Sequence, residues 1–408
     1  MKGNPSPHSR PLVSRAVVIK VMTLGVSLAL GVFGCEVLSR FALNPADFLS
    51  PRMVKDDVLG ITVAPHSSGF DEWGFRNREV PRIADVVTVG DSHTYGNTSK
   101  MDDAWPSVVA RATKLQVYNL GLGGYGPNQY YHLLTTKGLK LHPKWVVCGI
   151  YMGDDFENAF MITYGLDHWA SLRKGQWKDI NPDIWGAAAP PVWGADIRNW
   201  LSEHSMVYRL IFHSPLFAIL KEAVRFNQVS EKIDPYATAL IVEDQNIREA
   251  FRPIGMAERL DKNSGPVQEG MRITFHLLKE MDRACKQAGC TFLTVIIPTK
   301  ETVFAEYIAK DPHLHLRDAL EQVIVNEQSV KKDLVEFLSS EGIAHVDALP
   351  ALRRSVKDQL YAQTTRDMHP GKNGYRVIGD TVVEYLVQYA SEGGAAHSAQ
   401  AKTPMPPQ

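Results

Sequence analysis

The sequence predicts an α/β protein built on a parallel sheet, preceded by one segment long enough to span a membrane. Short, nearly continuous apolar runs end in turn residues, and longer amphipathic stretches separate them. This alternation is typical of βαβ units. The membrane segment is indicated by an uncharged apolar run behind a basic amino terminus. A chain of 408 residues has room for one large α/β domain that carries an insertion.

The composition excludes several classes of protein. The 44 basic and 45 acidic residues leave a net charge of −1, so no overall field attracts nucleic acid. The hydrophobic content of 44% and the charged content of 22% exclude a wholly disordered chain and a multi-span membrane protein. Four cysteines are too few for a disulfide-built scaffold. Cys285 and Cys290 are expected to be two buried thiols, with their pairing in an oxidising compartment as the alternative.

The amino end has the pattern of an uncleaved signal anchor. Residues 1–15 form a basic flank, and residues 16–38 form an apolar segment of the length that a helix needs to cross ~30 Å of hydrocarbon. Basic flanks stay cytoplasmic, so the rest of the chain is expected on the periplasmic or outer face. A cleaved signal peptide is the alternative. The prediction is a single-pass membrane protein with an extracytoplasmic main domain.

Behind the anchor, the sequence predicts a linker, a main domain and a tail. Residues 39–82 are rich in turn residues and are expected to form a linker with a hairpin that leads into the main domain at 83–392. The tail at 393–408 is expected to be disordered. The expected strands are 85–89, 115–119, 145–151, 291–297 and 343–346. The expected helices are 104–113, 128–138, 267–288, 329–340 and 372–389.

Residues 156–265 separate the third and fourth strands by far more than an ordinary connection, which predicts an insertion. The insertion holds five of the eight tryptophans of the chain. Most of these rings are expected to form the small core of a cap, and the alternative is that they stack on sugars or line an acyl groove. The five are Trp169, Trp177, Trp185, Trp193 and Trp200.

Polar and glycine-rich residues follow each of the first three strands. Ser92 stands where the first strand passes into a helix, at the carboxyl edge of the sheet where open α/β folds bind ligands. Asn119 ends the second strand, and four glycines in the next residues, Gly124 among them, allow the backbone to approach a ligand closely. Asp154 follows the third strand. Each feature alone is also typical of an ordinary cap or tight loop.

Near the carboxyl end, Asp367 and His369 precede an amphipathic helix. In an extended segment, positions two apart project to the same side, so both side chains can reach one site. The positive end of the following helix disfavours the imidazolium form, which leaves His369 able to act as a base. His93, His276 and His345 have no comparable setting and are expected to be structural or surface groups.

These four blocks, in this order at these strand ends, resemble the SGNH (GDSL-type) hydrolase family, as do residues 73–77 before the first strand. The resemblance covers about residues 56–390 and implies a flavodoxin-like three-layer sandwich with five parallel strands. It implies that Ser92 is the nucleophile and that Asp367 and His369 are its acid and base. It also implies that the amides of Ser92 and Gly124 are oxyanion donors, with Asn119 as a brace.

Two departures from the family pattern involve Asp154 and Asp367. The family offers an asparagine where this chain has Asp154. Asp154 is therefore expected to be protonated, or to point away and be replaced as donor by Asn158 or a water, or else the enzyme is expected to be slow. If Asp154 is the oxyanion position, its replacement by asparagine raises the rate. The family often places the acid three residues before the histidine, where this chain has Arg366. Asp367, two residues before, is also seen among relatives and is the expected acid.

The expected function is hydrolysis of carboxylic esters in the cell envelope, on O-acyl groups such as acetyl esters of a glycan, with no metal or cofactor. An O-acetyltransferase acting on an exported polysaccharide and a non-catalytic glycan-binding module are the alternatives. The expected partners are an O-acylated glycan or small ester, the membrane through residues 16–38, and proteins that modify envelope polysaccharides.

Overall fold

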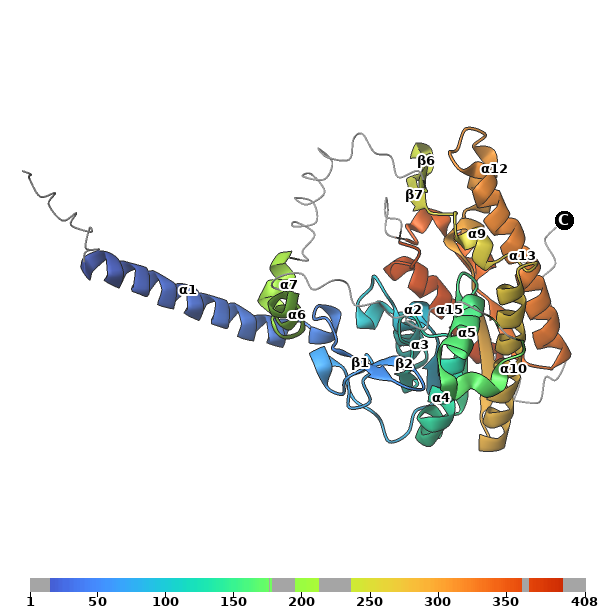
Figure 1. The fold of residues 1–408 in the computed structure, drawn as a ribbon, viewed down its shortest axis with the longest axis horizontal. Helices are drawn as coiled ribbons and strands as arrows, with labels where there is room; N and C mark the ends of the chain where they lie inside the picture. The colour runs from blue at the N-terminus through green and yellow to red at the C-terminus, as the bar shows by residue number, and fades with distance from the viewer. Residues whose placement is uncertain (1–14, 176, 178–194, 213–235, 362–366, 392–408) are drawn as a thin grey trace, which may run out of the picture.

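The protein is described from a computed structural model that covers residues 15–175, 177, 195–212, 236–361 and 367–391. The expected tail at 393–408, together with Trp185 and Trp193, lies outside the described residues. Figure 1 shows a long amino-terminal helix that projects from an α/β domain.

A parallel sheet of five strands forms the centre of the domain, in the order β4-β3-β5-β8-β9. The strands are β3 Val86–Val89, β4 Val117–Asn119, β5 Trp145–Tyr151, β8 Thr291–Ile297 and β9 Ala344–Asp347. Counted within the sheet, this order is 2-1-3-4-5, the flavodoxin-like arrangement. The expected fold class is therefore confirmed. The chain leaves β3 on one side for β4 and returns on the other side for β5, which creates a crevice at the carboxyl ends of these strands.

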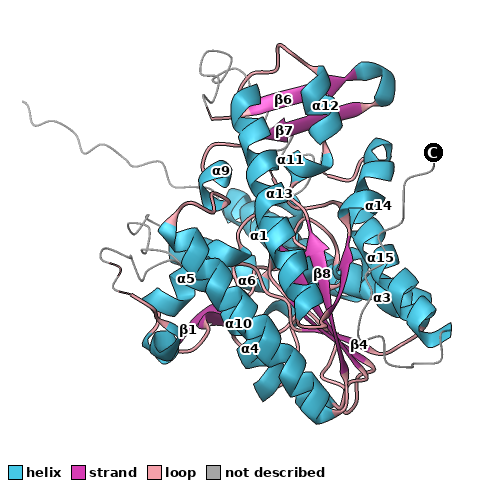
Figure 2. Ribbon diagram, turned by 90° about the vertical axis from the view of Figure 1, so that its right-hand side faces the viewer, coloured by secondary structure: helices cyan, strands magenta, loops and turns pink. Residues whose placement is uncertain are grey.

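Helices cover both faces of the sheet (Figure 2). One layer contains α3 Trp105–Thr113, α14 Leu349–Arg354 and α15 Lys372–Ser391. The other contains α4 Pro127–Thr136, α5 Asp155–Gly165, α10 Gly265–Ala288 and α13 Arg317–Ser340. The inner strands β3, β5 and β8 are buried on both faces, which explains why they are almost continuously apolar, whereas the edge strand β9 is only partly buried.

Several short elements connect these layers. The short helices are α2 Ser92–Tyr95, α9 Met256–Arg259, α11 Lys300–Val303 and α12 Ala305–Lys310. The 3₁₀ turns are Pro45–Asp47, Ser67–Gly69, Met101–Asp103, Gly138–Leu141, Asp167–Leu172, Glu243–Gln245 and Val356–Asp358.

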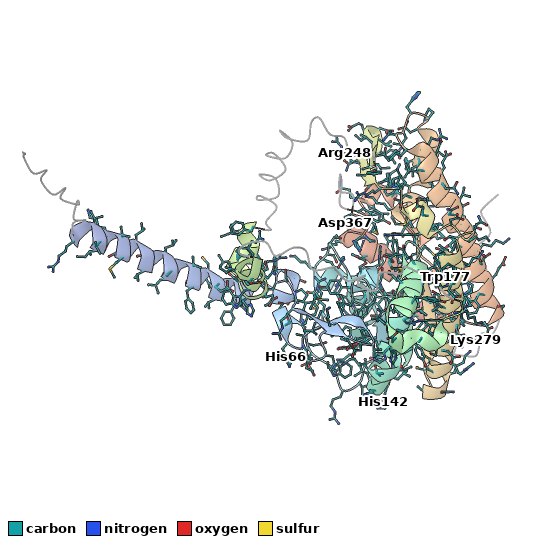
Figure 3. The ribbon with its side chains drawn as sticks, in the orientation of Figure 1. His66, His142, Trp177, Arg248, Lys279 and Asp367 are labelled. Atoms are coloured by element: carbon teal, nitrogen blue, oxygen red, sulfur yellow. The ribbon has the colours of Figure 1, made fainter. Side chains whose placement is uncertain are left out.

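The segment before the sheet consists of α1 Arg15–Ala42 and an antiparallel hairpin, β1 Met53–Asp56 with β2 Gly60–Val63. Val17–Ala42 is long and apolar enough to cross a membrane, and it lies at the amino end, where a signal sequence passes the same test. Figure 3 shows the side chains of α1 projecting outward along its length.

The segment between β5 and β8 differs from the expected insertion at its start. Its first residues form α5, which packs against α10 as part of the helix layer, so the added material begins after Gly165. It includes α6 Ala195–His204, α7 Met206–Phe212 and an antiparallel hairpin, β6 Thr238–Val242 with β7 Ile247–Phe251. The sequence analysis missed this hairpin, and it missed the first half of α13.

The described tryptophans of this segment have three different environments. Trp169 is buried and donates from Nε1 to the Val58 carbonyl at 2.9 Å, which fits the expectation that it is a core residue. Trp177 is partly exposed and packs edge-on against Phe160, whereas Trp200 is exposed and stacks on His204. All four cysteines are free, and Cys285 and Cys290 are buried thiols, as expected.

Candidate active site

Three strand ends carry the expected site residues to one edge of the sheet. Ser92 begins α2 two residues after Gly90, Asn119 is the last residue of β4, and Asp154 lies just beyond β5. Because the strands are parallel, these ends meet at the crevice between β3 and its two neighbours. Figure 3 shows His142, which precedes β5, at the lower edge of the domain, and Asp367 well above it.

Ser92, His369 and Asp367 form a continuous chain of hydrogen bonds. The Ser92 hydroxyl lies 2.7 Å from Nε2 of His369, and Nδ1 of His369 lies 2.6 Å from Oδ1 of Asp367. The backbone amide of His369 also donates to this Asp367 oxygen at 2.9 Å. The imidazole is therefore held with Nδ1–H toward the acid and the Nε2 lone pair toward the serine. This is the arrangement of a Ser–His–Asp triad.

The loop that carries His369 is tied to the loop that follows Ser92. Thr98 donates from its hydroxyl to the Pro370 carbonyl at 2.8 Å, and the Tyr375 hydroxyl donates to the Asn97 carbonyl at 3.0 Å. The amide of Asn97 lies 3.5 Å from Nε2 of His369. These contacts join residues that are more than 270 positions apart and fix the distance between base and hydroxyl.

Asp367 is suited to hold a positive imidazole. Burial opposes its ionisation, but the hydrogen bonds from the ring and amide of His369 outweigh burial and lower the pKa of the Asp367 carboxyl. The group is therefore ionised when His369 takes up a proton. Ser92 is buried, and its backbone amide is the first of helix α2, where no preceding turn offers an acceptor.

The glycine-rich turn after β4 lies directly against Ser92. A Cβ on Gly123 would lie 3.7 Å from the Ser92 Cβ, and Gly124 continues the same turn with φ of +78°. The side chain of Asn119 holds the base of this turn, because it accepts from the Gly121 amide at 2.8 Å and donates to the Thr94 carbonyl at 2.8 Å. Asn119 is thus in the position of a brace.

Three carboxylates converge behind Ser92. Asp91, Asp154 and Asp155 each place one oxygen within 4.8 Å of the others. Asp91 accepts from the backbone and from Nδ1 of His93, at 2.9 Å and 3.0 Å. Burial opposes ionisation of Asp91, but the contacts with His93 keep its pKa low. Asp91 is therefore the anionic member of the cluster.

Asp154 and Asp155 are driven toward the protonated form. Burial raises the pKa of each carboxyl well above its ordinary value, and the anionic Asp91 raises it further. Asp155 accepts from the Tyr130 hydroxyl at 2.6 Å and from the Tyr151 amide at 2.9 Å. Within the described part of the chain, Oδ1 of Asp154 is buried without a hydrogen-bond partner. A protonated Asp154 is thus a donor that no protein group uses.

The spacing of the three carboxylates also fits a metal ion, but their partners do not. His93 directs a ring nitrogen at Asp91, and Tyr130 and an amide direct hydrogens at the two oxygens of Asp155. A cation would have to displace these donors. The described partners of Asp91 and Asp155 are therefore hydrogen-bond donors.

His93 is the site residue that the sequence analysis missed. It is buried, its ring stacks on Tyr151 with centroids 3.7 Å apart, and it lies 4.8 Å from the ring of His369. Burial lowers the pKa of the His93 imidazole, which favours its neutral form. The signal was present, because Asp91 and His93 repeat the Asp-x-His spacing of Asp367 and His369 and make the same pair of hydrogen bonds.

The segment before β3 supports the site from behind. Arg76 is buried and donates to Asp47 at 2.6 Å and to the Ser99 carbonyl at 2.8 Å, so it fixes the loop beyond α2. Asn77 exchanges hydrogen bonds with the backbone of Asn119 at 2.9 Å and 3.0 Å. These residues position the two loops that face the hydroxyl.

A cavity of about 480 Å³ is lined by Asn97 and Thr98 after α2, with Phe48 and Arg209 on its other walls. A second cavity, of about 300 Å³, lies behind Asn119 and does not include Ser92 or His369 among its lining residues. Ser92 and His369 do not line the first cavity either, which approaches them only through Asn97, whose amide lies 3.5 Å from Nε2 of His369.

No family model matches the sequence, and the search of curated proteins gives no match. Among solved structures, the chain is similar to an extracellular lipase from Streptomyces rimosus, with 10% identity, a TM-score of 0.38 and coverage of 75% of this chain and 99% of that one. It is similar to a GDSL-like lipase from Bacteroides thetaiotaomicron, with 12% identity, a TM-score of 0.34 and coverage of 74% and 87%.

It is also similar to an acetylxylan esterase from Geobacillus stearothermophilus, solved as a catalytic mutant, with 10% identity, a TM-score of 0.35 and coverage of 79% of this chain and 99% of that one. Likenesses this distant say nothing about the chemistry, which depends on the geometry of the chain itself.

Proposed function

We propose that the protein is a serine-dependent carboxylic ester hydrolase. The observation that carries the proposal is the hydrogen-bonded chain from the Ser92 hydroxyl through His369 to Asp367. His369 takes the hydroxyl proton at Nε2 as Ser92 Oγ attacks the ester carbonyl. The imidazolium, held by Asp367, then gives that proton to the leaving alcohol, which departs as the acyl–oxygen bond breaks. Water releases the acid from Ser92 by the same route in reverse.

The oxyanion of each tetrahedral intermediate needs hydrogen-bond donors. The amides of Ser92 and of the Gly123–Gly124 turn supply two of them in this proposal, and the protonated carboxyl of Asp154 supplies the third. The raised pKa of Asp154 favours this role, because burial and the anionic Asp91 both favour the protonated carboxyl. A protonated Asp154 in place of the asparagine then keeps a hydrogen-bond donor at this position and adds no negative charge that would repel the oxyanion.

The proposed substrates are O-acyl esters outside the cytoplasm, acetyl esters of a glycan foremost. Lys2, Arg10, Arg15 and Lys20 precede or begin the apolar helix, and a basic flank of this kind stays cytoplasmic. The domain after α1 then faces the periplasm or the outer surface. The half-exposed indole of Trp177 is of the type that contacts mixed polar and apolar ligands.

Hydrolysis of p-nitrophenyl acetate by the purified full chain in detergent tests the proposal. Activity is expected in the native protein and absent in Ser92→Ala and His369→Ala. Ser107→Ala is the matched control, since Ser107 is partly buried on α3 and donates only to the Met101 carbonyl. No turnover by the native protein, or equal turnover by Ser92→Ala, contradicts the proposal.

An O-acetyltransferase differs from this enzyme only in the acceptor that attacks the acyl-serine. Incubation with an acetyl donor and an oligosaccharide separates the two activities. Release of free acetate faster than acetylation of the sugar supports the hydrolase, and the opposite order supports the transferase. A glycan-binding module without catalysis predicts neither product.

A further inference from the structure

The helices α6 and α7 are built onto the domain-proximal end of α1, although more than 150 residues separate them in sequence. The Glu36 carboxylate accepts from the amides of Met206 and Val207, both at 3.0 Å, and from the Ser205 hydroxyl at 3.1 Å. It therefore satisfies the free amides at the start of α7. Arg40, one turn along α1, donates to the His204 carbonyl at 2.5 Å.

The opposite side of this helix pair is joined to the linker. The Ser50 amide donates to the Ser202 carbonyl at 2.9 Å, and the Ser68 hydroxyl donates to the Glu203 carbonyl at 3.3 Å. Arg209 hydrogen-bonds to the Phe48 carbonyl. The pair is thus fixed between α1 and the domain (Figure 1).

The length of α1 sets the depth of this attachment in a membrane. The nineteen residues from Val17 to Cys35 carry no charge apart from Lys20 and rise about 28 Å as a helix. This length is close to the ~30 Å of the hydrocarbon core. Glu36, the next residue, then falls at the level of the lipid headgroups. The start of α7 lies at the same level, because its amides bind this carboxylate.

Exposed apolar side chains occur at this level. Ile197 and Trp200 on α6 are 67% and 58% exposed and, being three positions apart, lie on the same face of the helix. Leu38 and Phe41, beside the attachment on α1, are 69% and 88% exposed. Tryptophan is favoured at the boundary between headgroups and acyl chains.

We propose that α6 lies in the outer interface of the bilayer, with Ile197 and Trp200 inserted at the headgroup–acyl boundary. The domain then contacts the membrane through α6 as well as through α1. The occupant of this apolar face is the lipid surface, since it continues the apolar surface of α1 at the same depth. The proposal rests on the membrane span proposed above and is independent of the catalytic one.

Fluorescence quenching of the full chain in phosphatidylcholine–phosphatidylglycerol vesicles tests the proposal. Cys35 is the single exposed cysteine, so a Cys35→Ser background takes one NBD label at Ile197→Cys or Trp200→Cys. Val325→Cys on α13, at 58% exposure, is the matched control away from α1, and Leu28→Cys reports on the span. Lipids with a nitroxide near the headgroup are expected to quench the labels at 197 and 200 severalfold more than the label at 325.

Quenching at position 28 without quenching at 197 and 200 overturns the proposal while the span stands. Absence of quenching at all four positions overturns both. Glu36→Ala provides a second test, because it removes the acceptor for the start of α7 while the apolar part of α1 stays intact. It is expected to weaken quenching at position 200 and leave that at 28 unchanged, and equal quenching at 200 with and without Glu36 contradicts the proposed attachment.

Discussion

Replacement of Asp154 tests whether its carboxyl donates a hydrogen bond to the oxyanion. Asp154→Ala removes the proposed third oxyanion donor. Loss of one such donor lowers kcat by about 100- to 1000-fold, which corresponds to about 3 to 4 kcal/mol. The rate increase expected from the sequence applies to an ionised Asp154, whereas the raised pKa favours the protonated form. Asp154→Asn then retains a donor of similar shape, so its kcat at neutral pH is expected to stay within about tenfold of the native value.

The pH dependence of the Asp154→Asn variant gives the sharper result. Burial and Asp91 raise the pKa of Asp154, which favours the protonated carboxyl, and the native protein loses this proton as pH rises through the raised pKa. The resulting anion repels the oxyanion, and the native kcat falls on the alkaline side. An amide has no such proton to lose. The ratio of variant to native kcat is therefore expected to rise with pH.

The assay is the steady-state hydrolysis of p-nitrophenyl acetate by both variants and the native protein, from mildly acidic to alkaline pH. A native kcat in Asp154→Ala refutes the assignment of Asp154 to the oxyanion. A ratio for Asp154→Asn that is constant across the pH range refutes its protonation.

Three further predictions concern the acid of the triad and the stability of the fold. Asp367→Asn is expected to lower kcat on the order of 10⁴-fold with KM nearly unchanged, because the imidazole loses its tautomer and its counter-charge; an unchanged kcat in the same esterase assay counts against its role. Gly270→Ala is expected to lower the free energy of unfolding by about 1 to 3 kcal/mol in urea, since a Cβ there would lie 2.0 Å from the Phe156 carbonyl oxygen; native stability contradicts the close packing of α10 on α5. Burial raises the pKa of Glu327 to about 7 from 4.5, so the stability contributed by its protonated form is present below about pH 4.5 and is lost as pH rises through 7. Between about pH 5 and about pH 8, the free energy of unfolding of Glu327→Gln is therefore expected to fall by roughly 2 to 3 kcal/mol less than that of the native protein. If the free energies of unfolding of the two proteins change in parallel with pH, the assignment is contradicted.

The sheet and its helices were predictable because their sequence pattern follows from burial. β5 and β8 have the predicted boundaries, since each is an apolar run that ends in turn residues. The β6–β7 hairpin was missed because its strands are only five residues long and alternate buried and partly exposed residues. The first half of α13 was missed because Leu316, its N-cap, offers no capping side chain.

The triad was predictable in part because parallel strands bring their carboxyl ends together. Ser92 and Asp154 follow from this rule, whereas the approach of His369 depends on contacts such as that of Thr98 with Pro370, which no local pattern encodes. His93 is a buried structural group, one of the two alternatives expected for it; its stacking on Tyr151 and its distance to His369 are tertiary and could not be predicted from the sequence. The protonation of Asp154 likewise required knowledge that Asp91 lies beside it.

Mass spectrometry after treatment with a fluorophosphonate tests most directly whether the histidine activates the serine. The reagent forms a stable ester only with a hydroxyl that a neighbouring base deprotonates. The prediction is a single phosphonyl adduct on the peptide that contains Ser92, lost in His369→Ala. An unmodified Ser92 peptide in the native protein, or equal modification in His369→Ala, contradicts it.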